Sequence, residues 1–371
     1  MKNIVFFTIL LLFIGCEPWV DVFEDDITLE VIMFESSDIG EDITVNFDSL
    51  KVVTWNIRNG FGRFPWIYDS CGDSVISDKN SIENVLSKVA KKLDEIGADV
   101  VLLQEVDFLS KRSSYINQVQ FLLDNTSLNF GAYASMYKTD FVPSDGLGMV
   151  DGGNVVLSKY KLEDAQRIPL ALRTDQGSLE QYFYLRRNIL KVKIPELSQN
   201  GKDFYAVNIH ATAFATDDTK QKHIDKYIKV LNEINSSGDL FVSGGDLNSV
   251  PPGSEIDFCE ADRCEGEVCD GDYKNNSAYY GTYFGHFEGE PDLLVPLYNN
   301  YVAAIDLEDA NLPSHFTHAK STSFEADSIK FDRKLDYLFT NSDWHSEQTH
   351  QESWALSDHT AVSATFSLTA E

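Results

Sequence analysis

The stretch Leu240-Phe-Val-Ser-Gly-Gly-Asp-Leu-Asn248 carries the pattern that decides the fold. Its first residues are apolar and predict a buried strand, which ends at the Gly244-Gly245 pair, where backbone can bend and approach a ligand closely. Asp246 and Asn248 follow with one residue between them, so both side chains point the same way in an extended chain. Asp and Asn also favour turns, and a capped turn is therefore the alternative interpretation.

The same order of helix, buried strand and carboxylate occurs twice in the chain. Apolar residues recur at helical spacing from Ile82 to Ile96, with Asn80 or Ser81 as the expected N-cap and Gly97 just past the end. The segment Asp99-Val-Val-Leu-Leu-Gln-Glu105 then predicts a buried strand that ends in a carboxylate. A second helix, with apolar residues at positions 224–234, precedes the strand at Leu240 in the same way.

Further strands are predicted at Lys51–Asn56, Lys334–Thr340 and Ala361–Phe366. Between the two helix–strand units, Gly153–Ser158, Arg187–Lys193 and Phe204–His210 are predicted as strands without long helices between them. Successive strands of this kind imply antiparallel hairpins, so the sheets are expected to be mixed. Together with the two helix–strand units, they predict a layered α/β fold in which polar groups gather at strand ends.

The composition is that of a folded and strongly acidic protein. The 371 residues allow one large domain or two ordinary ones, and an apolar content of 43% is enough for a full core. The net charge of −29 repels polyanions, which disfavours extended non-specific binding along DNA. It does not exclude one phosphate bound at a metal site, and it also fits an exported protein.

The N-terminus resembles that of a bacterial lipoprotein. The apolar run from Ile4 to Ile14 is shorter than the roughly 20 residues of a membrane span and is typical of a signal-peptide core. Leu-Phe-Ile-Gly-Cys follows the lipoprotein pattern except at Phe13, with Cys16 as the lipidated residue. A diacylated cysteine suffices for stable anchoring, so a cell-envelope, outer-membrane or cell-surface lipoprotein is expected. An ordinary signal peptide and a secreted protein are the alternative.

This pattern divides the chain into a signal peptide at 1–15, an acidic tether with an accessory strand at 16–48, and one folded domain at 49–371. An irregular insertion is expected at about 251–300, where three of the five cysteines cluster. The cysteines other than Cys16 are expected to form two disulfides, with three possible connectivities, among Cys71, Cys259, Cys264 and Cys269. A calcium site in this acidic loop is the alternative, although the spacing does not match an EF-hand.

Polar residues accumulate at the predicted strand ends: Asn56, Glu105, His210, Asp246, Asn248, Asp358 and His359, with Asp336 just behind. Carboxylate and amide oxygens suit a hard divalent ion, with Mg²⁺ expected and Mn²⁺ or Ca²⁺ as alternatives. Histidines that can become cationic suit a phosphate group. A metal, a cationic histidine and a carboxylate base are the groups that phosphate-ester hydrolysis requires.

Six motifs resemble, in order, those of the endonuclease/exonuclease/phosphatase superfamily: Trp55-Asn56-Ile-Arg58, Leu103-Gln-Glu105, Asn208-Ile-His210, Gly245-Asp246-Leu-Asn248, Leu335-Asp336-Tyr and Ser357-Asp358-His359. This superfamily includes deoxyribonuclease I-like enzymes, abasic-site endonucleases, neutral sphingomyelinases and inositol-polyphosphate 5-phosphatases. Arg58 places the first motif closer to the deoxyribonuclease I branch, since abasic endonucleases usually carry an acidic residue there. The resemblance implies an α/β (α+β) fold, a four-layer αββα sandwich of two packed mixed β-sheets flanked by helices.

The resemblance also implies a role for each residue. Glu105 would be the main metal ligand, and Asn56 would lie close to both metal and phosphate. Asp246 would orient or deprotonate the attacking water, while Asn248 would donate a hydrogen bond to a phosphate oxygen. Arg58 is a further candidate for phosphate binding.

Three more positions complete the implied site. His359 would bind the phosphate, and Asp336 would fix its ring and favour its charged form. Asp358 would serve a second or alternative metal position, and His210 would contact the phosphate or the leaving group. The remaining histidines are expected to face solvent (His223, His286, His315, His318, His345 and His350), although His315 and His318 could touch substrate.

The expected function is metal-dependent hydrolysis of a phosphoester, most of all a phosphodiester, by a monomer. A nuclease-like activity is favoured by the first motif and by basic residues that could form a local positive groove: Arg58, Arg63, Arg186, Arg187, Arg333 and Lys334. A phospholipid or small phosphate ester is favoured by the net charge and the expected membrane anchor. A catalytically inactive surface binding protein is the remaining alternative, although no key residue is missing.

Overall fold

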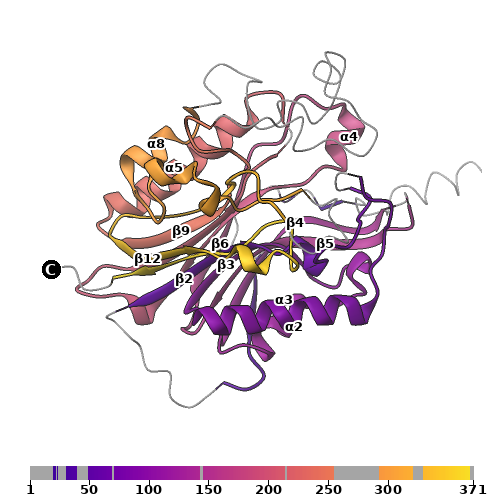
Figure 1. The fold of residues 1–371 in the computed structure, drawn as a ribbon, viewed down its shortest axis with the longest axis horizontal. Helices are drawn as coiled ribbons and strands as arrows, with labels where there is room; N and C mark the ends of the chain where they lie inside the picture. The colour runs from indigo at the N-terminus through magenta and orange to yellow at the C-terminus, as the bar shows by residue number, and fades with distance from the viewer. Residues whose placement is uncertain are drawn as a thin grey trace, which may run out of the picture.

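Two mixed β-sheets form the centre of the molecule (Figure 1). The computed structural model describes residues 20–21, 23, 31–39, 49–68, 71–142, 145–213, 215–254, 292–320 and 329–367. The strand order is β1-β4-β5-β3-β2-β13-β12 in one sheet and β10-β11-β9-β8-β7-β6 in the other. Each sheet contains one parallel pair, β2 with β3 and β8 with β9, among antiparallel neighbours.

The seven-stranded sheet consists of β1 (Val31–Glu35), β4 (Phe130–Val142), β5 (Gly148–Ser158), β3 (Val100–Asp107), β2 (Leu50–Asn56), β13 (Val362–Phe366) and β12 (Trp344–Thr349). The six-stranded sheet consists of β10 (Val302–Ala303), β11 (Asp336–Thr340), β9 (Leu240–Asp246), β8 (Phe204–His210), β7 (Asn188–Lys193) and β6 (Glu163–Pro169).

Helices cover the outer face of each sheet. The helices α2 (Lys79–Ile96) and α3 (Gln118–Asp124) pack on the seven-stranded sheet, and α5 (Thr219–Ser236) and α8 (Val295–Asn300) pack on the six-stranded one (Figure 1). Two short helices, α4 (Ser178–Tyr182) and α9 (Leu307–Ala310), lie in connections. Each sheet forms one apolar core with the helices that cover it, and a third apolar core lies between the two sheets. The expected four-layer sandwich of mixed sheets is confirmed.

The central strands are apolar on both faces because both faces are buried. In β3, Val100 and Leu102 pack between the sheets, whereas Val101 and Leu103 pack against the helices. This alternation follows the two-residue period of a strand, and it explains why a continuous apolar run was readable as a strand.

The ends of α2 differ slightly from the expectation. Asp78 is the N-cap, and its carboxylate accepts a hydrogen bond from the backbone amide of Ser81, so the prediction of Asn80 or Ser81 was wrong. Gly97 ends the helix with a left-handed φ of 75°, a conformation that glycine adopts at little cost.

Several earlier expectations fall on residues outside the described ranges. These are the signal peptide, Cys16, positions 255–291 of the insertion, and the cysteines other than Cys71, so the disulfide pairing stays a prediction. The accessory strand corresponds in part to β1, which pairs with β4. Within the described residues, no helix has the length and apolar character needed to cross a membrane.

Candidate active site

The parallel pair of each sheet brings polar strand ends to one edge. Asn56 ends β2 beside β3, which carries Glu105, while His210 and Asp246 are paired at the ends of β8 and β9. Asp336 begins the antiparallel β11 directly opposite Asp246. Because parallel neighbours end at the same edge, residues far apart in sequence meet there.

Hydrogen bonds and short polar contacts join the two sheets at this edge. Asn56 Nδ2 donates to Asp246 Oδ2 at 3.1 Å and to Glu105 Oε1 at 3.2 Å. His210 Nε2 lies 3.4 Å from Asp246 Oδ2 and 3.9 Å from Glu105 Oε1. Four of the expected site residues therefore form one connected group that spans both sheets.

The Gly244-Gly245 pair allows β9 to fit between its neighbours. A Cβ on Gly245 would lie 1.8 Å from the carbonyl oxygen of Ile209, and one on Gly244 would lie 2.2 Å from that of Tyr337. The close approach made here is to adjacent strands, rather than to a ligand as the sequence suggested. The glycines thereby set the position of Asp246 relative to β8 and β11.

Asp246 and Asn248 form both a turn and a site. The Asn248 amide N–H donates to Asp246 Oδ1 at 2.9 Å, and Asn248 Nδ2 donates to the Ala211 carbonyl at 3.0 Å. Burial raises the pKa of Asp246 to about 7, and repulsion from Asp336 adds to this, although His359 opposes it. A carboxylate that titrates near neutral pH is suited to act as a general base.

The two histidines at this edge differ in charge. His359 Nδ1 lies 2.8 Å from Asp336 Oδ2, and its Nε2 lies 3.7 Å from Asp246 Oδ2. Burial alone would lower the pKa of His359, but these two carboxylates raise it well above the ordinary value. Burial and the nearby Arg187 charge lower the pKa of His210 well below the ordinary value, so its ring is neutral.

Glu105 is held by two amides at a break in the strand pairing. The register of β3 and β5 shifts there, and Glu105 has a left-handed φ of 53°. Asn56 and Asn59 each donate to one oxygen of its carboxylate, Asn59 at 3.3 Å. Arg112 in turn donates to Asn59 Oδ1 at 2.7 Å and pairs with Asp107. Sequence reasoning missed Asn59 and Arg112, although Asn59 directly follows the Asn-Ile-Arg motif.

Arg58 lies behind Asp358. Its Nη1 donates to the Gly62 carbonyl at 2.7 Å, and its Nε lies 3.6 Å from Asp358 Oδ2. Burial raises the pKa of Asp358, but the charges of Arg58, His359 and His318 outweigh this and lower it to about 2. Arg58 is itself buried, so the structure places it as a support for Asp358; its suggested contact with phosphate stays a prediction.

Two expectations about the surface were wrong. The proposed positive groove is not exposed, because most of its basic residues are buried: Arg58, Arg186, Arg187, Arg333 and Lys334. His223 and His350 are also buried, where sequence alone favoured solvent. His223 packs under the site, accepting a hydrogen bond from the Thr212 amide at 3.1 Å.

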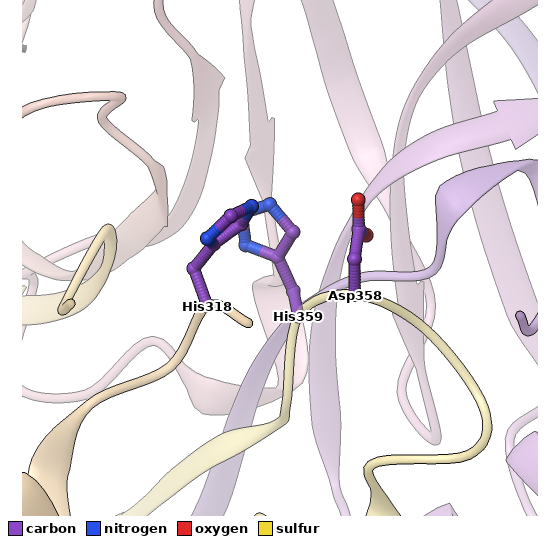
Figure 2. Close-up of side chains that lie close together, drawn as sticks. All are labelled: His318, Asp358 and His359. Atoms are coloured by element: carbon purple, nitrogen blue, oxygen red, sulfur yellow. The ribbon is translucent and has the colours of Figure 1, made fainter. Parts of the chain in front are cut away.

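The donor groups fit a hard divalent ion. Among the described residues, two sets of three potentially metal-ligating side chains lie close together. One set is Asp246, Asp336 and His359, and the other, drawn in Figure 2, is His318, Asp358 and His359. Asp336 Oδ1 is buried without a hydrogen-bond partner. Glu105 belongs to neither set. Its side chain is 29% exposed, and the hydrogen bonds described above to its carboxylate oxygens come from the side-chain amides of Asn56 and Asn59. Carboxylate oxygens of this kind suit Mg²⁺ or Mn²⁺.

Comparison with known proteins identifies the family. The sequence model of the Endonuclease/Exonuclease/phosphatase family matches residues 53–359. The chain belongs to this family. The matched range includes all the site residues expected from the sequence except Cys16, from Asn56 to His359. Members of the family are generally hydrolases of phosphoester bonds that use divalent metals.

Solved structures of similar fold come from distant relatives. An endonuclease/exonuclease/phosphatase from Beutenbergia cavernae DSM 12333 superposes with a TM-score of 0.53 at 17% identity, covering 85% of this chain and 71% of that one. A family protein from Leptotrichia buccalis C-1013-b has a TM-score of 0.49 at 16% identity, covering 85% and 98%. Truncated Caenorhabditis elegans TDP2 superposes with a TM-score of 0.44 at 16% identity, and the match covers 86% of this chain and 97% of that one. At these identities the similarity shows the fold alone. No curated protein matches the chain.

Proposed function

We propose that this protein is a metal-dependent phosphodiesterase that uses in-line attack of water on phosphorus. The observation that carries the proposal is a buried cluster in which a carboxylate base, Asp246, lies 3.7 Å from a cationic histidine, His359. A base for water and a positive charge for phosphate are thereby held together. Asp336, which contacts His359 at 2.8 Å, keeps that charge in place.

Each side chain then has a defined task. A divalent ion, when bound, would neutralise phosphate charge and lower the pKa of water. Glu105 and Asn56 would hold it, with Asp358 as a second position. Asp246 accepts a proton from the attacking water. Asn248 donates one amide hydrogen to Ala211, which leaves its other amide hydrogen for a phosphate oxygen. Neutral His210 contacts the phosphate without adding charge.

The substrate we propose is a nucleic-acid-type phosphodiester that is engaged mainly through one phosphate. Burial of the basic side chains that flank the motifs argues against contacts with many successive phosphates. The net charge of −29 favours a second candidate, a phospholipid or another small phosphate ester. Turnover of plasmid DNA, RNA, sphingomyelin and inositol phosphates, compared in one panel, separates these classes.

Removal of the metal is expected to abolish turnover of bis(p-nitrophenyl) phosphate. EDTA should stop the reaction, and added Mg²⁺ or Mn²⁺ should restore it. Glu105→Gln is expected to lower metal affinity by at least about 100-fold, since even outer-shell partners of a metal are worth 10–100-fold. Binding of Mn²⁺, followed by calorimetry, measures this without turnover.

Glu95→Gln is the matched control, because Glu95 is an exposed residue of α2 that pairs only with Lys91 in these contacts. It should bind Mn²⁺ as the wild type does. Full activity of the EDTA-treated protein would contradict the metal requirement.

We also propose that the chain is exported and anchored in the cell envelope through a lipid on Cys16. The support is the Leu-Phe-Ile-Gly-Cys pattern that follows an apolar run. Cells that express the protein should incorporate labelled fatty acid into it, and Cys16→Ser should remove both the label and the membrane fraction. Cys71→Ser should keep the label. An exported but unlabelled wild type would support an ordinary signal peptide instead.

A further inference from the structure

We propose that Arg112 is a positioning residue that sets the affinity of the site for its divalent ion. This inference rests on the proposed function, in which Glu105 helps to hold that ion. Arg112 lies in a short 3₁₀ helix (Lys111–Ser113) after β3 and belongs to none of the six motifs. Its Nη2 donates to Asn59 Oδ1 at 2.7 Å, and Asn59 Nδ2 donates to Glu105 Oε2 at 3.3 Å. A line of hydrogen bonds therefore runs from Arg112 to the expected metal ligand.

The chemistry of the three groups fixes the direction of this line. A guanidinium can only donate hydrogen bonds, so the side-chain amide of Asn59 must turn its oxygen toward Arg112. Its NH₂ group then faces Glu105, whose ionised carboxylate can only accept. Without the guanidinium, the amide could turn over and place its oxygen against the carboxylate, which would repel it. Arg112 therefore selects the one orientation of Asn59 that holds Glu105.

Contacts on several sides keep the guanidinium of Arg112 in place. Its Nε and Nη2 both donate to the Asp107 carboxylate, at 3.0 Å and 2.7 Å, and Ser113 donates to the same carboxylate at 2.7 Å. The guanidinium carbon lies 4.8 Å from the centroid of the Trp66 ring. Gly152 leaves the necessary room, because a Cβ there would lie 2.9 Å from Arg112 Nη2. The side chains of Arg112 and Asp107 are only 12% and 0% exposed, so little solvent competes with these contacts.

The backbone at both ends of the link from Asn59 to Glu105 also needs support. Asn59 has a φ of 54° and Glu105 a φ of 53°, and this left-handed conformation costs free energy in residues other than glycine. Gln118 of α3 holds Asn59: its Nε2 donates to the Asn59 carbonyl at 2.6 Å, and its Oε1 accepts from the Asp107 N–H at 3.0 Å. The network thus fixes both the backbone and the side chain of Asn59. Such bracing orients the Glu105 carboxylate before an ion binds, as a metal ligand requires.

Arg112→Lys tests this link, because lysine keeps a positive charge beside Asp107 but lacks the planar fork that reaches Asp107 and Asn59 together. It is expected to lower the affinity for Mn²⁺ by about 10- to 100-fold, the range for loss of an outer-shell partner. Calorimetry of Mn²⁺ binding to the full chain measures this without turnover. At saturating Mn²⁺, kcat for bis(p-nitrophenyl) phosphate should return close to the wild-type value, because the groups proposed to contact phosphate are unchanged.

Asn59→Gly tests the same link from its other end. Glycine adopts a φ of 54° at little cost, and the ion pair between Arg112 and Asp107 stays intact. The loss of Mn²⁺ affinity should be at least as large as in Arg112→Lys. Because Arg112 acts through Asn59, the double variant should bind Mn²⁺ no more weakly than Asn59→Gly alone. Additive losses would overturn the proposal.

Arg173→Lys is the matched control. Arg173 likewise donates through two nitrogens to a carboxylate, that of Asp175, and lies over the ring of Tyr184, and its side chain is also 12% exposed. This variant should bind Mn²⁺ as the wild type does, and thermal unfolding should show that all variants fold.

The outcomes separate this proposal from the proposed function. Wild-type affinity for Mn²⁺ in both Arg112→Lys and Asn59→Gly, with a loss only in Glu105→Gln, would overturn the role of Arg112 alone. A kcat of Arg112→Lys that stays low at saturating Mn²⁺ would show general damage to the site and would overturn that role too. A wild-type protein that binds no Mn²⁺ and is fully active in EDTA would overturn the proposed function together with this role.

Discussion

Asp246→Asn is expected to lower kcat for bis(p-nitrophenyl) phosphate by about 10³-fold, in the middle of the range for a lost general base. The amide cannot accept a proton from water, yet it keeps the size of the carboxylate. Its oxygen can still accept the hydrogen bond that Asn56 Nδ2 makes to Oδ2 at 3.1 Å. The loss should therefore appear in kcat more than in KM.

The pH profile provides a second measurement. Burial raises the pKa of Asp246 to about 7, and only the ionised carboxylate can accept a proton, so wild-type kcat should rise with pH through that value. The residual activity of Asp246→Asn should lack this rise. Asp225→Asn, at an exposed position of α5, is the control and should behave as the wild type does. Unchanged turnover in Asp246→Asn would remove the central assignment of the site.

His359→Ala is expected to lower kcat about as much as Asp246→Asn does, and Asp336→Asn should lower it less. Removing the imidazole takes away the cation proposed to bind phosphate, whereas removing the carboxylate only weakens its orientation and charge. Because Asp336 acts through His359, to which it lies 2.8 Å away, the double variant should be no slower than His359→Ala alone. Steady-state kinetics of the three variants form a double-mutant cycle.

Unfolding measurements give the same pair an independent test. His359→Ala leaves two buried carboxylates without their counter-charge, which should cost about 3–5 kcal/mol of stability. Asp336→Asn in that background removes one of those charges and should recover part of the loss. His345→Ala, on the exposed strand β12, should change neither kcat nor the free energy of unfolding. Additive effects of the two substitutions on rate would show that Asp336 acts independently of His359.

The parts of the fold that were predictable from sequence are those in which burial leaves a clear pattern. The strands β3 and β9 begin with continuous apolar runs because sheet and helix layers cover both their faces. The strands β4, β6 and β12 were not predicted. Small residues dilute the alternation in β4, which contains Gly131, Ala132, Ala134 and Ser135, whereas β6 and β12 are polar strands at sheet edges.

Residue types and their order along the chain were sufficient to indicate the family and the expected site. Asn56, Glu105, Asp246 and His359 were all named from motifs that are local in sequence. The contacts between these residues are not local in sequence. Asn56 and Asp246 are separated by 190 positions and are in contact only because the two sheets pack face to face.

Only the tertiary structure decided the charges within that site. His210 ends β8 and His359 lies in the connection before β13, and although they are the same residue type, one is neutral and the other cationic. Both rings are buried, so the difference depends on the carboxylates close to His359, Asp336 above all, and a linear pattern does not contain those distances. For the same reason, the sequence did not show that most basic residues of the expected surface groove are buried. It also did not show that His318, which no motif contains, packs against His359. A protonation state or a contact depends on what surrounds a group in space, and the chain sets those surroundings only once it is packed.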